Sequence, residues 1–171
     1  MLFTTTVFIY LFLPVVLAGY FVGGRLFGGT AARLWLTLAS LFFYGYWGPK
    51  YLLLIAISIL FNYFLGALIA RSARESIAPQ TSARNALLLI GVALNVAALG
   101  YFKYSDFLID TVNVLTDSHL ANLNLILPLG ISFFTFTQIA YLVDCSKADV
   151  EEYSLLNYTL FVTFFPHLIA G

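Results

Sequence analysis

Charged residues are scarce in this sequence. Only 9% of its 171 residues are Asp, Glu, Lys or Arg, whereas 61% are hydrophobic. A soluble domain usually carries about 25% charged residues, because it must cover its core with a water-facing surface. With so few charges such a surface cannot be built. The composition therefore predicts an integral membrane protein, with membrane lipid as its principal partner.

Cysteine is nearly absent, and the formal net charge is zero. Cys145 is the single cysteine, which excludes an intrachain disulfide and a cysteine-rich metal site. We predict no metal ion. A chain without excess positive charge also has no basic surface for nucleic acid, so we expect no nucleic-acid partner.

The few charges are bunched, and long uncharged runs separate them. About 20 apolar helical residues cross the hydrocarbon core of a bilayer, and these runs lack the alternating pattern of membrane β-strands. We therefore predict an all-α fold, a polytopic transmembrane helical bundle that forms a single domain over residues 1–171. The predicted spans are 2–22, 34–46, 51–70 and 85–102, followed by a broken segment at 123–143 and a final segment at 153–171.

Basic residues in short loops predict the orientation, because Lys and Arg stay on the cytoplasmic side. The first and third loops are the basic ones, and the second holds only Lys50. The N-terminus and the acid-rich region after residue 102 are then expected outside. The basic residues of the first and third loops are Arg25, Arg33, Arg71, Arg74 and Arg84.

Two stretches after residue 102 depart from a simple span. Residues 105–120 are expected to begin as a surface helix with Phe107, Leu108, Val112 and Leu115 on one face. Pro128 and Gly130 then interrupt the fifth apolar stretch. Proline removes a backbone hydrogen bond, so this stretch is either a kinked span or helix start, or a re-entrant element that lines a substrate path.

Three polar residues in apolar surroundings are candidates for a functional site. His167 lies within an apolar segment, where an ionisable residue is a functional candidate that could act as a general base. We favour a histidine that is hydrogen-bonded to a neighbouring helix or lies at the membrane interface. Gln138 and Asp144 follow Pro128, and both a site-lining role and, for Asp144, a role at a helix end are open.

Several segments together resemble the membrane-bound O-acyltransferase family, and most closely its bacterial alginate O-acetylase branch. The C-terminal ones are Leu127–Phe136, Gln138–Asp144 and Phe161–Gly171; earlier ones are Ser40–Tyr44, Asn62–Gly66 and Leu99–Tyr104. The resemblance covers nearly the whole chain. It implies a bacterial inner-membrane enzyme, in which the outside N-terminus that the basic loops predict is periplasmic.

The resemblance implies transfer of an acyl group, usually acetyl, to hydroxyls of an exported polysaccharide such as alginate. It implies a cytoplasmic donor such as acetyl-CoA, no bound cofactor, and a periplasmic partner protein that modifies the polysaccharide. Two alternatives are D-alanyl transfer to teichoic acid in the same family and a non-enzymatic membrane scaffold or transporter piece.

The chain also departs from the family, whose members are much longer. Their catalytic histidine is expected beyond Gly171, so we assign no catalytic residue here and do not give that role to His167. Gly171 ends the chain inside an apolar segment. We expect a truncated, N-terminal part of the fold that supplies scaffold and funnel lining and is inactive by itself. Gln138, Asp144 and His167 are the candidate funnel-lining residues.

Overall fold

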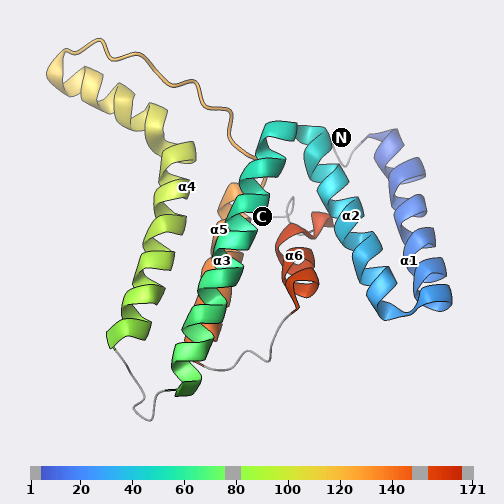
Figure 1. Cartoon of the computed structure of the whole chain (residues 1–171). Coiled ribbons are helices and arrows are strands. Elements are labelled where there is room, and N and C mark those ends of the chain that lie inside the picture. The colour runs from blue at the N-terminus through green and yellow to red at the C-terminus, as the bar shows by residue number, and fades with distance from the viewer. Residues whose placement is uncertain (1–4, 76–81, 148–153, 167–171) are drawn as a thin grey trace. The chain divides into compact units, whose positions relative to one another are not determined.

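The computed structural model describes residues 5–75, 82–147 and 154–166. Within these ranges the fold is all-α and contains no strand, which confirms the predicted fold class. The helices are α1 (Leu13–Phe27), α2 (Gly29–Trp47), α3 (Pro49–Glu75), α4 (Ser82–Thr116), α5 (Ile131–Ser146) and α6 (Leu155–Thr163), with a π-helical turn, η1 (Phe8–Phe12), before α1. Figure 1 shows their order along the chain.

Three of the described helices are long and apolar enough to cross a membrane. They cover Phe8–Phe27, Pro49–Ala73 and Ala83–Thr116. The protein is accordingly a multi-pass membrane protein. These helices contain or overlap the predicted spans 2–22, 51–70 and 85–102. Crossing by 34–46, 123–143 and 153–171 stays a prediction, as does the single membrane domain.

The helices group into two compact units. The first comprises Met1–Phe64 and Val150–Gly171, and the second comprises Leu65–Asp149. The boundary falls within α3, whose N-terminal part belongs to the first unit and whose C-terminal part belongs to the second. The first unit is thus built from two segments that are distant in sequence.

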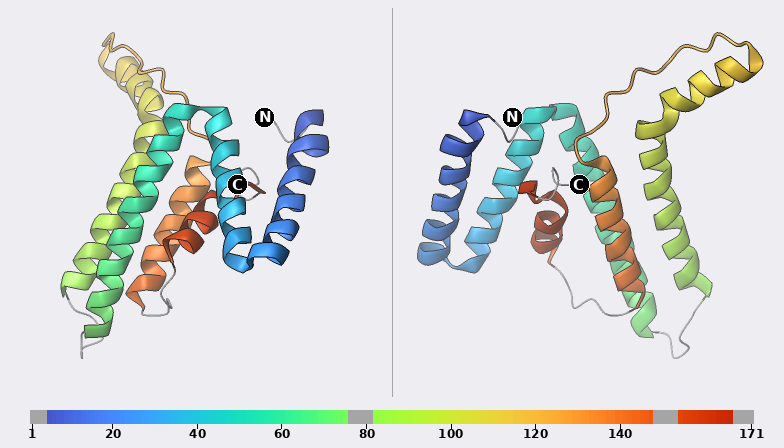
Figure 2. Two further views of the ribbon diagram at one scale, coloured as in Figure 1. Left: turned by 45° about the vertical axis from the view of Figure 1, so that its right-hand side comes forward. Right: turned by 180° about the vertical axis from the view of Figure 1, so that it is seen from behind.

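In the first unit, α1 and α2 form an antiparallel pair and α6 packs against α2 (Figures 1 and 2). Pro14 lacks a backbone N–H and its ring crowds the carbonyl four residues earlier, which disfavours a regular turn. The wider π-helical turn precedes it, and the N–H of Leu13 donates to the carbonyl of Phe8. The indole of Trp35 on α2 donates to the carbonyl of Val16 on α1 at 3.0 Å.

In the second unit, α5 packs along α4. The broken segment predicted at 123–143 is irregular up to Pro128, and its helix begins only at Ile131. Gly130 precedes the helix with φ of 64°, a left-handed conformation that glycine adopts without steric cost. The break is therefore a turn that starts α5.

Candidate functional site

The buried side of α5 contains Gln138. One stripe of this helix is buried, with members spaced three or four residues apart as the helical period requires. The stripe consists of Ile131, Phe134, Thr135, Gln138, Tyr141, Leu142 and Cys145. The side chain of Gln138 is fully buried in the middle of it. A buried amide among apolar side chains is costly unless its polar atoms are satisfied, so this position specifies the packing around α5.

The structure separates the three candidate residues. Asp144 is exposed and lies off the buried stripe that holds Gln138. The two side chains therefore do not line one common surface of α5. His167 lies outside the described residues. A funnel-lining role for the three stays a proposal.

A stripe of buried side chains with hydroxyl groups runs along α2. None of its residues is among the candidate site residues predicted from the sequence. Thr37, Ser40 and Tyr44 are spaced as one helical face and are all buried. The hydroxyl of Thr37 donates to the carbonyl of Arg33 at 2.8 Å. The signal that could have revealed this stripe is the recurrence of polar residues at intervals of three and four in an apolar run.

Ser40 ties α2 to the end of α6. The N–H of Phe165, just beyond the end of α6 at Thr163, donates to the hydroxyl oxygen of Ser40 at 3.4 Å, and the contact is buried. A buried backbone N–H needs such a partner, because leaving it unpaired costs free energy. Two segments that carry the family resemblance, Ser40–Tyr44 and Phe161–Gly171, thus meet within the first unit.

Four aromatic rings surround this junction. Phe8, Phe12, Phe43 and Phe165 are all buried, and every pair of their ring centroids lies 5.4–6.1 Å apart. Such separations are favourable for aromatic pairs. We call these four residues the phenylalanine cluster. It joins the start of the chain, α2 and the segment after α6.

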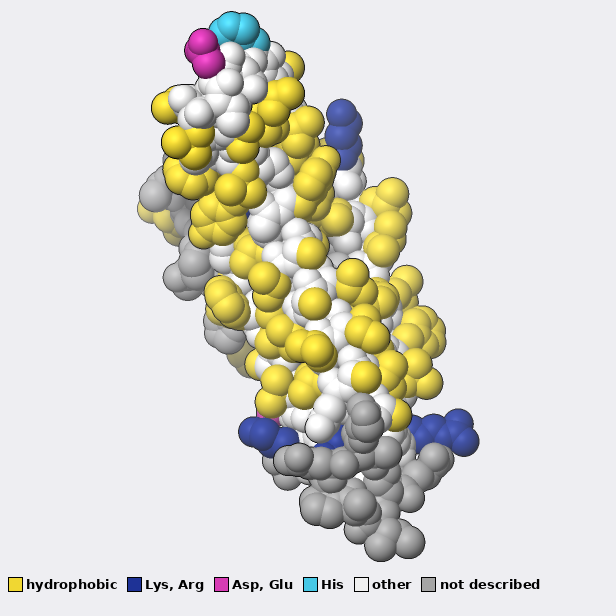
Figure 3. Space-filling view, turned by 90° about the vertical axis from the view of Figure 1, so that its left-hand side faces the viewer, with side chains coloured by type: hydrophobic (Ala, Val, Ile, Leu, Met, Phe, Trp, Pro, Cys, Tyr) yellow, Lys and Arg dark blue, Asp and Glu magenta, His cyan; other side chains and the backbone are white. Residues whose placement is uncertain are grey.

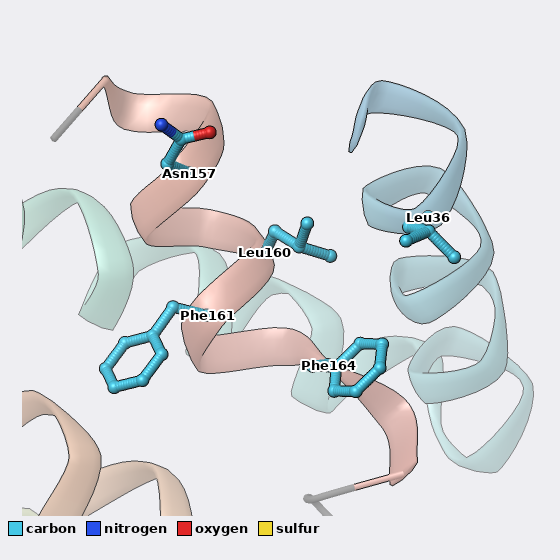
Figure 4. Close-up of a pocket in the computed structure, with 5 residues that line it drawn as sticks. All are labelled: Leu36, Asn157, Leu160, Phe161 and Phe164. Carbon is cyan, nitrogen blue, oxygen red and sulfur yellow. The ribbon is translucent and has the colours of Figure 1, made fainter. Parts of the chain in front are cut away.

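A surface pocket of about 360 Å³ lies between α2 and α6. Figure 4 shows Leu36 on α2 facing Leu160 and Phe164, which lie on and just after α6. Phe161 and Asn157 also line the pocket, and Asn157 lies on the first turn of α6. The amide oxygen of Asn157 accepts a hydrogen bond of 2.9 Å from Arg33. The pocket therefore has apolar walls and one amide, whose oxygen is already hydrogen-bonded to Arg33.

Segments that carry the resemblance also meet in the second unit. A Cβ on Gly66 would lie 2.4 Å from the ring of Tyr141, so α3 and α5 approach closely there. The ammonium of Lys103 donates to the hydroxyl of Ser132 at 3.4 Å. No three His, Cys, Asp or Glu side chains gather as a metal site among the described residues.

No family model and no solved structure matches the chain. Several curated proteins, however, are similar to the chain in sequence. The chain is 43% identical over 202 aligned residues to a peptidoglycan O-acetyltransferase of Helicobacter pylori, an alignment that covers the whole chain and 36% of that protein. It is 37% identical to a probable alginate O-acetylase of Pseudomonas aeruginosa, and this alignment covers the whole chain and 32% of that protein. It is 35% identical to a probable alginate O-acetylase of Pseudomonas putida, again over the whole chain and 34% of that protein.

The chain spans about a third of the length of these relatives. The similarity extends over all its residues, including both pairs of segments that the structure brings together. The chain is therefore homologous along its full length to these O-acetylases, which confirms the resemblance to the membrane-bound O-acyltransferase family.

Proposed function

We propose that the chain supplies the scaffold of a membrane enzyme that transfers acetyl groups to hydroxyls of an exported polysaccharide. The observation that carries this proposal is the full-length similarity to O-acetylases of two different polysaccharides, peptidoglycan and alginate. The acceptor class is therefore a glycan with free hydroxyls. Acetyl-CoA on the cytoplasmic side is the proposed donor, and a periplasmic protein is the proposed partner.

Acyl transfer needs a base for the hydroxyl proton while the acyl carbon moves from the thioester sulfur to the hydroxyl oxygen. Within the described ranges the only histidine is His119, which is exposed in the segment after α4. We propose that the base lies in the part of the relatives that this chain does not cover. In this proposal Gln138 and Asp144 line or support the funnel and do not react.

Complementation tests the proposed function. The complete gene is expressed in bacteria that lack either their alginate or their peptidoglycan O-acetylase, and ester-linked acetate released from each polysaccharide by mild alkali is measured. Restored acetate in one strain supports the proposal and identifies the acceptor. Release of D-alanine in place of acetate would assign the alternative acyl group. If the protein reaches the membrane and neither acetate nor D-alanine ester is found, the proposed enzyme function is contradicted.

The same assay tests the assignment of His167. We expect His167→Ala in the complete protein to retain a substantial part of the acetylation, because we place the base elsewhere. The amount of membrane-inserted protein is measured in parallel by immunoblot. Complete loss of acetate at an unchanged protein level would show that His167 is the base.

A further inference from the structure

The C-terminal part of α4 extends beyond what a membrane span needs. The helix has 35 residues, which corresponds to a length of about 52 Å, whereas the hydrocarbon core is about 30 Å thick. Around the end of the uncharged run lie residues of the types that collect at the membrane–water interface, namely Tyr101, Lys103 and Tyr104. Lys103 also lies over the ring of Tyr104, 5.6 Å from its centroid. Residues 105–116 therefore lie past the hydrocarbon core.

The helix also changes direction in this part, where its ribbon turns yellow in Figure 1. The hydroxyl of Ser105 donates to the carbonyl of Tyr101 one turn back, and such bonds often bend helices. The bend turns the last turns of α4 away from the axis of the span. A helix that leaves the membrane at an angle can remain close to its surface.

The polar side of this extension holds the chain segment that follows it. Asn113 donates to the carbonyl of Leu120 and accepts from its N–H, both at 2.9 Å. A carboxylate oxygen of Asp110 accepts from Asn122 at 2.9 Å, and one of Asp106 accepts from the N–H of Leu123 at 2.8 Å. We call these contacts the polar clasp. Asp106, Asp110 and Asn113 share one face of the helix, and the clasp occupies all three.

The opposite side of the extension is apolar and exposed. Leu108 and Leu115 are 57% and 77% exposed and lie across the helix from the polar clasp. Phe107 and Val112, which are also exposed, extend this face. Figure 3 shows hydrophobic side chains along this side of the molecule, with acidic and histidine side chains at its end. A large exposed apolar face marks an interaction surface.

We propose that residues 105–127 form a hairpin that lies in the interfacial layer of the bilayer. Leu108, Val112 and Leu115 insert toward the acyl chains, and the polar clasp faces the headgroups and water. The occupant of the apolar face is lipid because the face is continuous with a membrane-spanning helix and begins at its interfacial aromatic residues. The clasp also pairs both backbone groups of Leu120 and the N–H of Leu123, which lowers the cost of placing this irregular segment next to lipid.

The charge of the hairpin further defines the lipid it fits. It contains Asp106, Asp110 and Asp117 and no Lys or Arg. Attraction to anionic headgroups therefore cannot hold it at the surface, in contrast to basic amphipathic helices. Insertion of apolar side chains into a zwitterionic bilayer is the interaction that the residues support.

Fluorescence quenching in nanodiscs of phosphatidylcholine tests the proposal. The complete protein, with Cys145 and any cysteine outside these 171 residues replaced by Ser, carries either Leu115→Cys or His119→Cys. Each new cysteine is labelled with an environment-sensitive dye. We expect a lipid spin-labelled near the headgroup end of its acyl chain to quench the dye at position 115 severalfold more than at position 119. Aqueous iodide should show the reverse order.

Quenching at position 115 by iodide alone, or by neither quencher, would overturn the proposal, because the face would then lie in water or against protein. Leu108→Cys gives an independent position on the same face if the Leu115 variant does not fold. Replacing phosphatidylcholine by phosphatidylglycerol should not increase the lipid quenching. An increase would show that anionic headgroups hold the hairpin and would overturn the apolar basis of the contact.

Discussion

Gly66 allows α3 and α5 to approach each other in the second unit, because a Cβ at this position would lie 2.4 Å from the ring of Tyr141. Tyr141 is itself buried, so its ring has little room to move. We expect Gly66→Ala to lower the free energy of unfolding by about 1–3 kcal/mol through overpacking. Thermal unfolding of the purified protein in detergent measures the change.

Gly100→Ala in α4 is the matched control. A Cβ at Gly100 would meet no atom within 4 Å, so the change adds a better helix former without a clash. We expect it to be neutral or to stabilise by up to about 1 kcal/mol. Equal melting temperatures of the two variants would show that Tyr141 does not require the glycine.

Single residues also show how much of the candidate site could be predicted. The burial of Gln138 and the exposure of Asp144 follow from the helical period once the buried stripe of α5 is known. The contact of Ser40 with Phe165 does not follow from any local pattern, because the residues are 125 positions apart. Residue type and local spacing indicate which side chains are unusual, but long-range packing decides which of them meet.

At the scale of helices, the uncharged runs predict where helices occur better than where they end. The run at 85–102 stops at Lys103, yet α4 continues to Thr116. Neither proline nor glycine occurs between these residues, so nothing in the local sequence ends the helix, which stops before Asp117 with its φ of 51°. Charges mark the edge of the lipid, whereas backbone conformation marks the end of the helix.

The phenylalanine cluster fixes the segment after α6 to α2 and to the start of the chain. We expect Phe165→Ala to lower the free energy of unfolding by about 3–5 kcal/mol, because it removes one ring from a buried set of four. The expected result is a lower melting temperature together with faster proteolytic cleavage near α6.

Phe161→Ala provides the comparison within the same segment, since this ring is 54% exposed and lines the surface pocket. It should change the melting temperature and the cleavage rate much less than Phe165→Ala. If both variants were equally destabilised, the loss would not come from the cluster.

At the scale of the whole molecule, orientation in the membrane is a proposal based on the basic loops. We expect Lys50→Cys to react with a membrane-impermeant maleimide in intact cells. Arg74→Cys should react only after the membrane is permeabilised, because the basic third loop stays in the cytoplasm. Cys145 is buried and gives little background in folded protein. The opposite labelling pattern would reverse the proposed topology.

The phenylalanine cluster has a consequence for biosynthesis. Phe8, Phe12 and Phe43 are synthesised early, but Phe165 emerges only after the entire second unit has been translated. The 125 residues between Ser40 and Phe165 take roughly 6–25 s to synthesise at about 5–20 residues per second. During this interval three aromatic rings and the hydroxyl of Ser40 lack their final neighbour. The helices that carry these groups must thus wait for the second unit to be synthesised before their packing is complete, and lipid or the insertion machinery has to protect them in the meantime.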